Sequence, residues 1–225
     1  GSVQDVSLGD GPMAKRRIGR HSRWDLVDFA HLSVAGKLMR LELQQQFNNR
    51  QQIESRLFIT EDVQSPRAAT WAHVLPANFN CLAVTRHPSL PGVVVAFGGG
   101  TPLGHYPLAA KSLVMELRLA KPGDKPRTMH KLPMELPIND MVFADMDGQR
   151  GQELVIAPEG GEIAVFRITE REAVNITKTL GIQSGIGNWN SLACFDFSGN
   201  GRNDLLAGNW GSNNPLNRYA ENNYR

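Results

Sequence analysis

The sequence predicts an all-β fold, a β-propeller built of four-stranded blades of about 50–60 residues. One observation is a nine-residue loop at 196–204 that is rich in oxygen side chains and runs directly into the apolar segment 205–208. A second is a loop of the same pattern 51 residues earlier, at 145–153, which is again followed by an apolar segment at 154–157. A third is that this spacing fits four short strands with their connections, which is the size of one propeller blade.

An asparagine marks each repeat, six residues before the first residue of the loop. The three asparagines and the loop residues that follow them are Asn80 and Arg86, Asn139 and Asp145, and Asn190 and Asp196. The asparagines are separated by 59 and 51 residues. In the copy that begins at Asn80, arginine replaces the first aspartate, two prolines fill the turn and the loop is one residue shorter. We therefore expect that copy to bind no metal.

The predicted blades follow one another along the chain. They are a weak blade at 23–78, a degenerate blade at 79–137, a blade with a calcium loop at 138–188 and a partial blade with a calcium loop at 189–225. Further strands are expected at 93–97, 112–119 and 162–168. The weak blade aligns Trp24 with the repeated asparagine and places a strand at 38–43. An amphipathic helix from Trp24 to about Leu43 fits the same apolar residues nearly as well.

Both polar loops have the composition of a calcium site. Calcium takes six to eight hard oxygen ligands and tolerates irregular geometry, and alternate residues of a tightly curved loop point the same way. In the later loop the candidate ligands are Asp196, Ser198, Asn200, the carbonyl group of Arg202, and Asp204. In the earlier loop they are Asp145, Asp147, Gln149, the carbonyl group of Gly151, and Glu153.

Neutral oxygens among these ligands lower the charge of both sites, so the sequence predicts a modest calcium affinity, with a Kd of about 10⁻⁴ to 10⁻³ M. A metal-free turn is the alternative, because Asp, Asn, Ser and Gly favour turns for conformational reasons alone. An EF-hand is not indicated. That motif needs a glutamate at position twelve between two helices, whereas both loops lead directly into strand-like segments.

Residues 188–214 resemble the FG-GAP or VCBS-type repeat, in particular that of bacterial proteins that also carry an ASPIC/UnbV-type domain and are related to the integrin α-chain propeller. Segment 98–108 and the blade at 139–168 are similar to the same proteins. The resemblance implies a propeller of about seven blades, with calcium as a structural ion held by the loop residues named above. It also implies an extracellular, cell-surface or periplasmic protein that serves adhesion or ligand binding.

The two ends of the sequence carry separate expectations. Gly1 and Ser2 are typical of a tag-cleavage remnant, and residues 1–22 are expected to be a flexible basic segment. The polar stretch 211–225 lacks the outer strands of the last blade, which favours part of a larger propeller over a small closed ring. The chain has no stretch of about 20 apolar residues that would span a membrane. Its net charge of +2 is too small to indicate a nucleic-acid partner.

The leading hypothesis for function is a non-catalytic, calcium-stabilised module that binds a protein or glycan partner. One alternative is a propeller enzyme, polysaccharide-cleaving or hydrolytic, with its site at the central tunnel. Such chemistry needs paired carboxylates or a histidine with a nucleophile. The six histidines show no ligand spacing, and His105 with Tyr106 is the polar pair to test. Another alternative is an interaction piece whose missing blades come from another chain or from a copy of itself.

Overall fold

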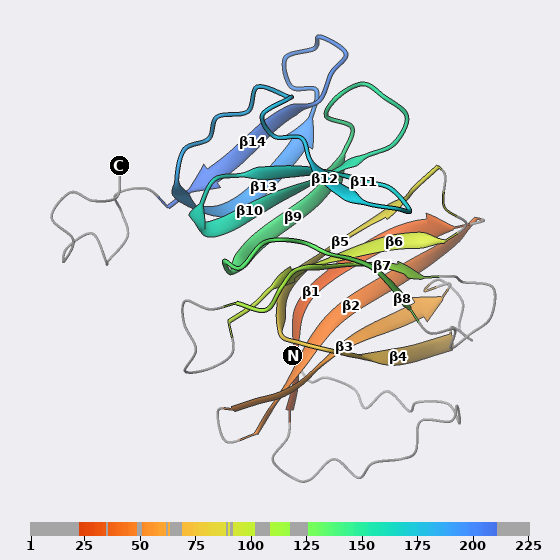
Figure 1. Ribbon diagram of the computed structural model, residues 1–225. Helices are drawn as coiled ribbons and strands as arrows, with labels where there is room; N and C mark the ends of the chain where they lie inside the picture. The colour runs from red at the N-terminus through yellow and green to blue at the C-terminus, as the bar shows by residue number, and fades with distance from the viewer. Residues whose placement is uncertain are drawn as a thin grey trace, which may run out of the picture.

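The computed structural model describes residues 23–34, 36–48, 51–61, 63, 69–88, 90, 92–101, 109–117 and 126–210. All the secondary-structure elements in these ranges are β-strands, and the paired strands run antiparallel (Figure 1). The predicted all-β class is therefore confirmed. The predictions made for residues 1–22, for His105 and Tyr106, and for residues 211–225 lie outside the described residues.

Consecutive strands pair as meanders. The first sheet contains β1 (Arg23–Val34), β2 (Lys37–Asn48), β3 (Gln51–Glu61) and β4 (Ala69–Leu75). The second contains β5 (Phe79–Arg86), β6 (Val93–Gly99), β7 (Leu113–Leu117) and β8 (Arg127–Lys131). The third contains β9 (Ile138–Ala144), β10 (Glu153–Gly161), β11 (Ala164–Ile168) and β12 (Ala173–Asn175). The hairpin of β13 (Gly187–Phe195) and β14 (Asp204–Asn209) follows, and β13 joins β10 through a short pairing.

The segment that fitted either a helix or a strand is a β-hairpin. β1 and β2 pair along almost their whole length. Met39, Leu41 and Leu43 of β2 are buried, whereas the residues between them are half-buried. This period of two belongs to a strand with one face against the core and does not suit a helix. The helix alternative for residues 24–43 is therefore wrong.

A β-bulge marks the same point in each first strand. Between two successive pairs with the second strand, the first strand advances by two residues while its partner advances by one. The extra residues are Val27, Asn80, Asn139 and Asn190. The asparagine that recurs in the sequence is thus the bulge residue of β5, β9 and β13. In β1 the bulge residue is Val27, so the alignment of Trp24 with the asparagines is wrong by three residues.

Apolar layers hold the sheets face to face, and the first strands β1, β5, β9 and β13 contact one another in chain order. Figure 1 shows this succession from the orange first sheet to the blue hairpin. β6 lies between two of the layers and is buried at every residue, which explains its unbroken apolar sequence. Fully burying a side chain such as Phe97 or Leu41 contributes roughly 1.5–3 kcal/mol. The described sheets remain open, and none closes on itself.

An aspartate beside the bulge ties two of the first strands to the sheet that follows. Oδ2 of Asp28 in β1 accepts a hydrogen bond from the N–H group of Leu82 in β5 at 2.7 Å. Asp140 has the same position in β9, and its Oδ2 accepts from the N–H group of Leu192 in β13, also at 2.7 Å. In both aspartates Oδ1 accepts from the N–H group of the next residue. A matched pair of hydrogen bonds therefore links two of the three successive interfaces.

Burial opposes the ionised form of both carboxylates. It raises the pKa of Asp28 and the pKa of Asp140 above their ordinary value, while the backbone N–H donors lower them. A smaller effect also raises the pKa of Asp140, because the Asp28 carboxylate repels it. Cys81 has the matching position in β5. Burial raises the pKa of its thiol, and the negative charges of Asp28 and Asp140 raise it further. The residues beside the bulges therefore interact electrostatically across three sheets.

We expect Asp140→Ala to lower the free energy of unfolding by about 2 kcal/mol, because two backbone N–H groups lose a charged acceptor. Asp28→Ala removes the matched hydrogen bonds at the other interface and should cost a similar amount. Urea denaturation followed by circular dichroism measures both variants. Glu162→Ala, at an exposed position of the third sheet, serves as the control and should change stability little. An unchanged urea midpoint for Asp140→Ala would show that these hydrogen bonds do not hold the sheets together.

The raised pKa of Asp140 also makes stability depend on pH. Stability contributed by a carboxyl group with a raised folded-state pKa is present at low pH and is lost as the pH rises through that value. Asparagine does not titrate. From about pH 4 to about pH 7, we expect wild type to lose stability relative to Asp140→Asn. Urea denaturation at constant ionic strength gives the difference at each pH, and a difference that favours wild type more at high pH contradicts the effect of burial.

Candidate metal centre

The two polar loops occupy the same place in consecutive sheets. Residues 145–152 connect β9 to β10, and residues 196–203 connect β13 to β14. The fourth residue of each loop is a glycine in the left-handed region, Gly148 with a φ of 74° and Gly199 with a φ of 72°. Glycine adopts this conformation without the strain that a side chain would introduce. The sequence similarity of the loops therefore reflects a shared backbone turn.

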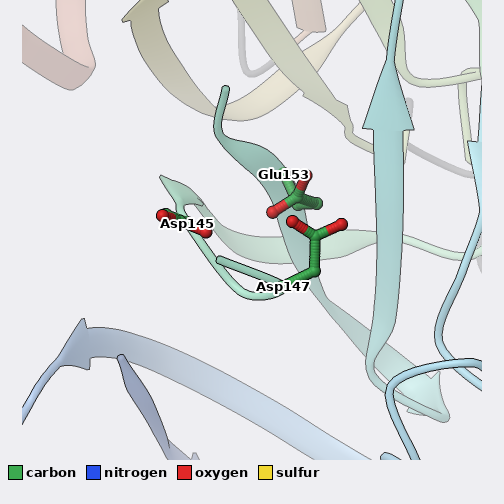
Figure 2. A group of neighbouring side chains, drawn as sticks. All are labelled: Asp145, Asp147 and Glu153. Carbon is green, nitrogen blue, oxygen red and sulfur yellow. The ribbon is translucent and has the colours of Figure 1, made fainter. Parts of the chain in front are cut away.

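Three carboxylates converge in the earlier loop. One oxygen each of Asp145, Asp147 and Glu153 lies within 4.8 Å of the other two (Figure 2). The β9–β10 register places Glu153 opposite Ala144, the residue just before the loop. Glu153 Oε2 accepts a hydrogen bond from the N–H group of Met146 at 2.9 Å. The strand register and the turn together bring these three predicted ligands to one point.

The other two predicted ligands of this loop are placed differently. Gln149 is exposed, and its N–H group donates to Asp147 Oδ1 at 2.8 Å. Gly151 is half-buried with a φ of 133°, a conformation that glycine adopts readily. The carboxylate group is thus built from the first, third and ninth residues of the loop.

A guanidinium group lies against the same carboxylates. Arg167 of β11 forms an ion pair through Nη2 with Asp147 Oδ2, and its Nε lies 4.0 Å from Glu153 Oε1. The side chains of Asp147 and Glu153 are only 8% and 5% exposed, whereas that of Arg167 is 39% exposed. Three carboxylates facing one guanidinium leave two formal negative charges when all are ionised. This balance suits a divalent cation.

Burial raises the pKa of Glu153, and repulsion by Asp147 and Asp145 raises it further. The Met146 N–H group and Arg167 lower it. The Glu153 carboxylate, whose side chain is largely buried, is therefore surrounded by more negative than positive charge. A cation bound there would relieve both the repulsion and the loss of hydration.

The later loop uses its oxygens within the turn. Asp196 Oδ1 accepts from the N–H group of Asn200 at 2.9 Å, and Asp196 Oδ2 accepts from that of Gly201 at 2.8 Å. Asp204 Oδ2 accepts from the N–H group of Ser198 at 2.9 Å. Asn200 Oδ1 accepts in turn from the N–H group of Arg202 at 2.8 Å. This loop, which carries the more specific sequence pattern, contains two carboxylates, and both accept N–H groups of the turn.

A solvent-open depression of about 540 Å³ lies between the two loops. Its lining includes Asp147, Arg167 and Arg202, and residues that follow β12 form another wall. The side-chain nitrogen of Asn203 donates to the carbonyl oxygen of Asp145 at 3.0 Å, which joins the loops directly. The carboxylate group therefore borders a surface hollow to which two successive sheets contribute.

Arg167 is the residue of this site that the sequence pattern does not identify. It is the single charged residue within the apolar segment 163–168, which marks it as unusual for a half-buried strand. Its position over the loop depends on the register of β11 against β10, which pairs Phe166 with Leu154. That register is a property of the folded sheet and cannot be read from spacing along the chain.

Comparison with known proteins adds no assignment. No family model and no curated protein matches this sequence. In the part of the chain that the structure describes, no helix is long and apolar enough to cross a membrane. Function is therefore inferred from the loops, the sheets and their exposed faces.

Proposed function

We propose that this chain is a non-catalytic binding module of propeller type, with FG-GAP or VCBS-like repeats and a structural calcium ion in the Asp145 loop. The observation that carries the proposal is the convergence of Asp145, Asp147 and Glu153 around a largely buried carboxylate. The donors are hard oxygens, the type that calcium prefers. Asp145, Asp147 and Glu153 would hold the ion.

The position of these residues supports an architectural role for the ion. Asp145 and Asp147 belong to the turn, whereas Glu153 belongs to β10, so one cation would fasten the turn to the strand. Because such ligands converge only in the folded loop, the free energy of binding adds to the free energy of folding. A modest affinity, with a Kd of about 10⁻⁴ to 10⁻³ M, is typical of extracellular calcium modules. It agrees with the proposed location at the cell surface or in the periplasm.

The sheet arrangement supports the propeller and the non-catalytic role. Four-stranded meanders whose first strands contact one another in chain order have the arrangement of successive blades. Asp28 and Asp140 are the paired carboxylates of the first strands, where an enzyme of this fold would place its chemistry. Each aspartate accepts two backbone N–H groups, one on each carboxylate oxygen. One of these groups belongs to the next residue, and the other belongs to the next first strand. These carboxylates therefore serve to hold successive sheets together. We assign the binding of a protein or glycan to the loops that connect the strands.

A second candidate function is supported by the outer face of the last hairpin. Leu192, Cys194 and Leu205 pack on the third sheet, whereas Phe195 and Leu206 on the opposite face are 50% and 58% exposed. In the third sheet the residue equivalent to Leu206 is Val155, which is buried beneath this hairpin. The outer face therefore has the apolar character of a surface that another sheet covers. We propose that a sheet of another chain or of a second copy completes the module there.

Calcium at about ten times its Kd should stabilise the folded protein by about 1.4 kcal/mol, and raise the melting temperature by about 3–6 °C. Differential scanning fluorimetry with calcium, with EDTA and with magnesium measures the shift. Asp147→Asn should abolish the shift, whereas Asp196→Asn, the matched change in the other loop, should retain it. A melting temperature that is the same in calcium and in EDTA would exclude a structural ion, and loss of the shift only in Asp196→Asn would move the site to the later loop.

The exposed face of the last hairpin should cause weak self-association, because apolar surface is removed from water when two copies meet. We expect the mass measured by sedimentation equilibrium to rise with protein concentration, and Leu206→Glu to abolish that rise. Val74→Glu, at a valine of the first sheet that is 55% exposed, is the matched control and should leave association unchanged. A strictly monomeric wild type that unfolds cooperatively would argue against completion by another sheet.

A further inference from the structure

Arg167 of β11 places a positive charge against the Asp145 loop. It follows Phe166, which pairs with Leu154, and so projects from β11 beside Glu153 at the start of β10. Its guanidinium group contacts Asp147 and approaches Glu153, two of the three carboxylates that converge there. A cation that binds these carboxylates would therefore lie close to the positive charge of Arg167.

We propose that Arg167 is an internal counter-cation that limits the affinity of the Asp145 loop for calcium. The proposal rests on the calcium site proposed above. The guanidinium group carries a full positive charge. It repels a divalent ion that approaches the same carboxylates, and it engages an oxygen of Asp147 that the ion would otherwise use.

The burial of the carboxylates makes this repulsion effective. The side chains of Asp147 and Glu153 are only 8% and 5% exposed, so water screens their interaction with Arg167 less than it would on a fully exposed surface. Electrostatic interactions weaken strongly in water and much less where water is excluded. Removing the charge of Arg167 would change the formal charge of the group from −2 to −3. Calcium sites bind more tightly as the charge of their ligands increases.

The second sheet indicates that the charge at this position follows the loop. The pair of Met115 with Val95 in the second sheet is equivalent to the pair of Phe166 with Leu154 in the third. The next residue of β7, Glu116, is therefore equivalent to Arg167 of β11. The loop of that sheet begins after Arg86 and lacks the acidic residues. Glu116 is buried, and Arg127 of β8 donates to its Oε2 from Nε at 3.0 Å and from Nη2 at 2.9 Å. The third sheet, which has the acidic loop, therefore carries a positive residue at this position, whereas the second sheet, which lacks that loop, carries a negative one.

This arrangement gives Arg167 two effects on the loop. Without calcium it compensates part of the negative charge and so allows the loop to fold. With calcium present it raises the concentration at which the ion binds. The module would therefore remain folded at low calcium and gain stability only at high calcium, instead of requiring the ion at all times.

Isothermal titration of the whole chain with calcium chloride tests the proposal, alongside the calcium-dependent change in melting temperature. We expect Arg167→Gln to bind calcium about tenfold more tightly than wild type, as expected for one more uncompensated ligand charge. We also expect a lower melting temperature in EDTA and a larger rise with calcium. Arg127→Gln breaks the comparable ion pair of the second sheet. It should lower the melting temperature in EDTA without changing calcium affinity.

Two further variants separate charge from packing. Arg167→Lys keeps the charge and should bind calcium as wild type does, whereas Arg167→Met removes the charge, keeps an apolar side chain and should bind as tightly as Arg167→Gln. Equal or weaker calcium binding by the two neutral variants would overturn the proposal and make Arg167 a residue that positions the ligands. Tighter binding by Arg167→Lys would also overturn it, because charge would not be the cause. Absence of calcium binding in wild type and in every variant would instead reject the calcium site itself.

Discussion

The β-bulge near the start of each first strand is the constraint on which the arrangement of the sheets depends. A bulge adds one residue to one strand and shifts the alternation of its side chains relative to the partner. In β5 the residue that follows the bulge is Cys81, which is buried in an apolar layer. In β1 and β9 that residue is an aspartate, and its carboxylate reaches the backbone of the next first strand. Asn139, the bulge residue itself, lies within hydrogen-bond distance of Asn190 Oδ1, so successive bulges also touch.

The polar loops inherit their positions from this spacing. Because the bulges fix how β9 and β13 lie relative to each other, the loops that follow these strands end up side by side, where Asn203 reaches Asp145. The register then decides which residues face one another within a sheet. Glu153 in the third sheet and Val94 in the second occupy the same place, opposite Ala144 and Thr85 respectively. The scaffold is constant, and the chemistry of each loop is set by a few substitutions on it.

The sequence predicts the strands and the repeat well where side-chain type and backbone position are linked. The asparagine marks the bulge in three strands, and the apolar segments after the loops begin β10 and β14. The first copy is misaligned because Val27 gives no chemical sign of the bulge. The direction of the loop oxygens is also beyond sequence reasoning, since the same residue types can surround an ion or accept N–H groups of their own turn. Asp196 accepts N–H groups of its own turn, whereas Asp145 lies close to Asp147 and Glu153.

The outer faces at the two ends of the stack, on the first sheet and on the last hairpin, carry different side chains. On the face of the first sheet that is turned away from the second sheet, Arg40 and Glu42 form an ion pair at 2.6 Å, at positions where the third sheet has the buried residues Leu154 and Ile156. The same face also carries Phe29 and Val74, which are 50% and 55% exposed, so it is mixed in character. A partner that covered it would have to remove the charges of the ion pair from water, which is costly. The outer face of the last hairpin presents Phe195 and Leu206, which are 50% and 58% exposed. The proposed addition of an apolar sheet beyond β14 would therefore avoid the cost of burying an ion pair that an addition before β1 would carry.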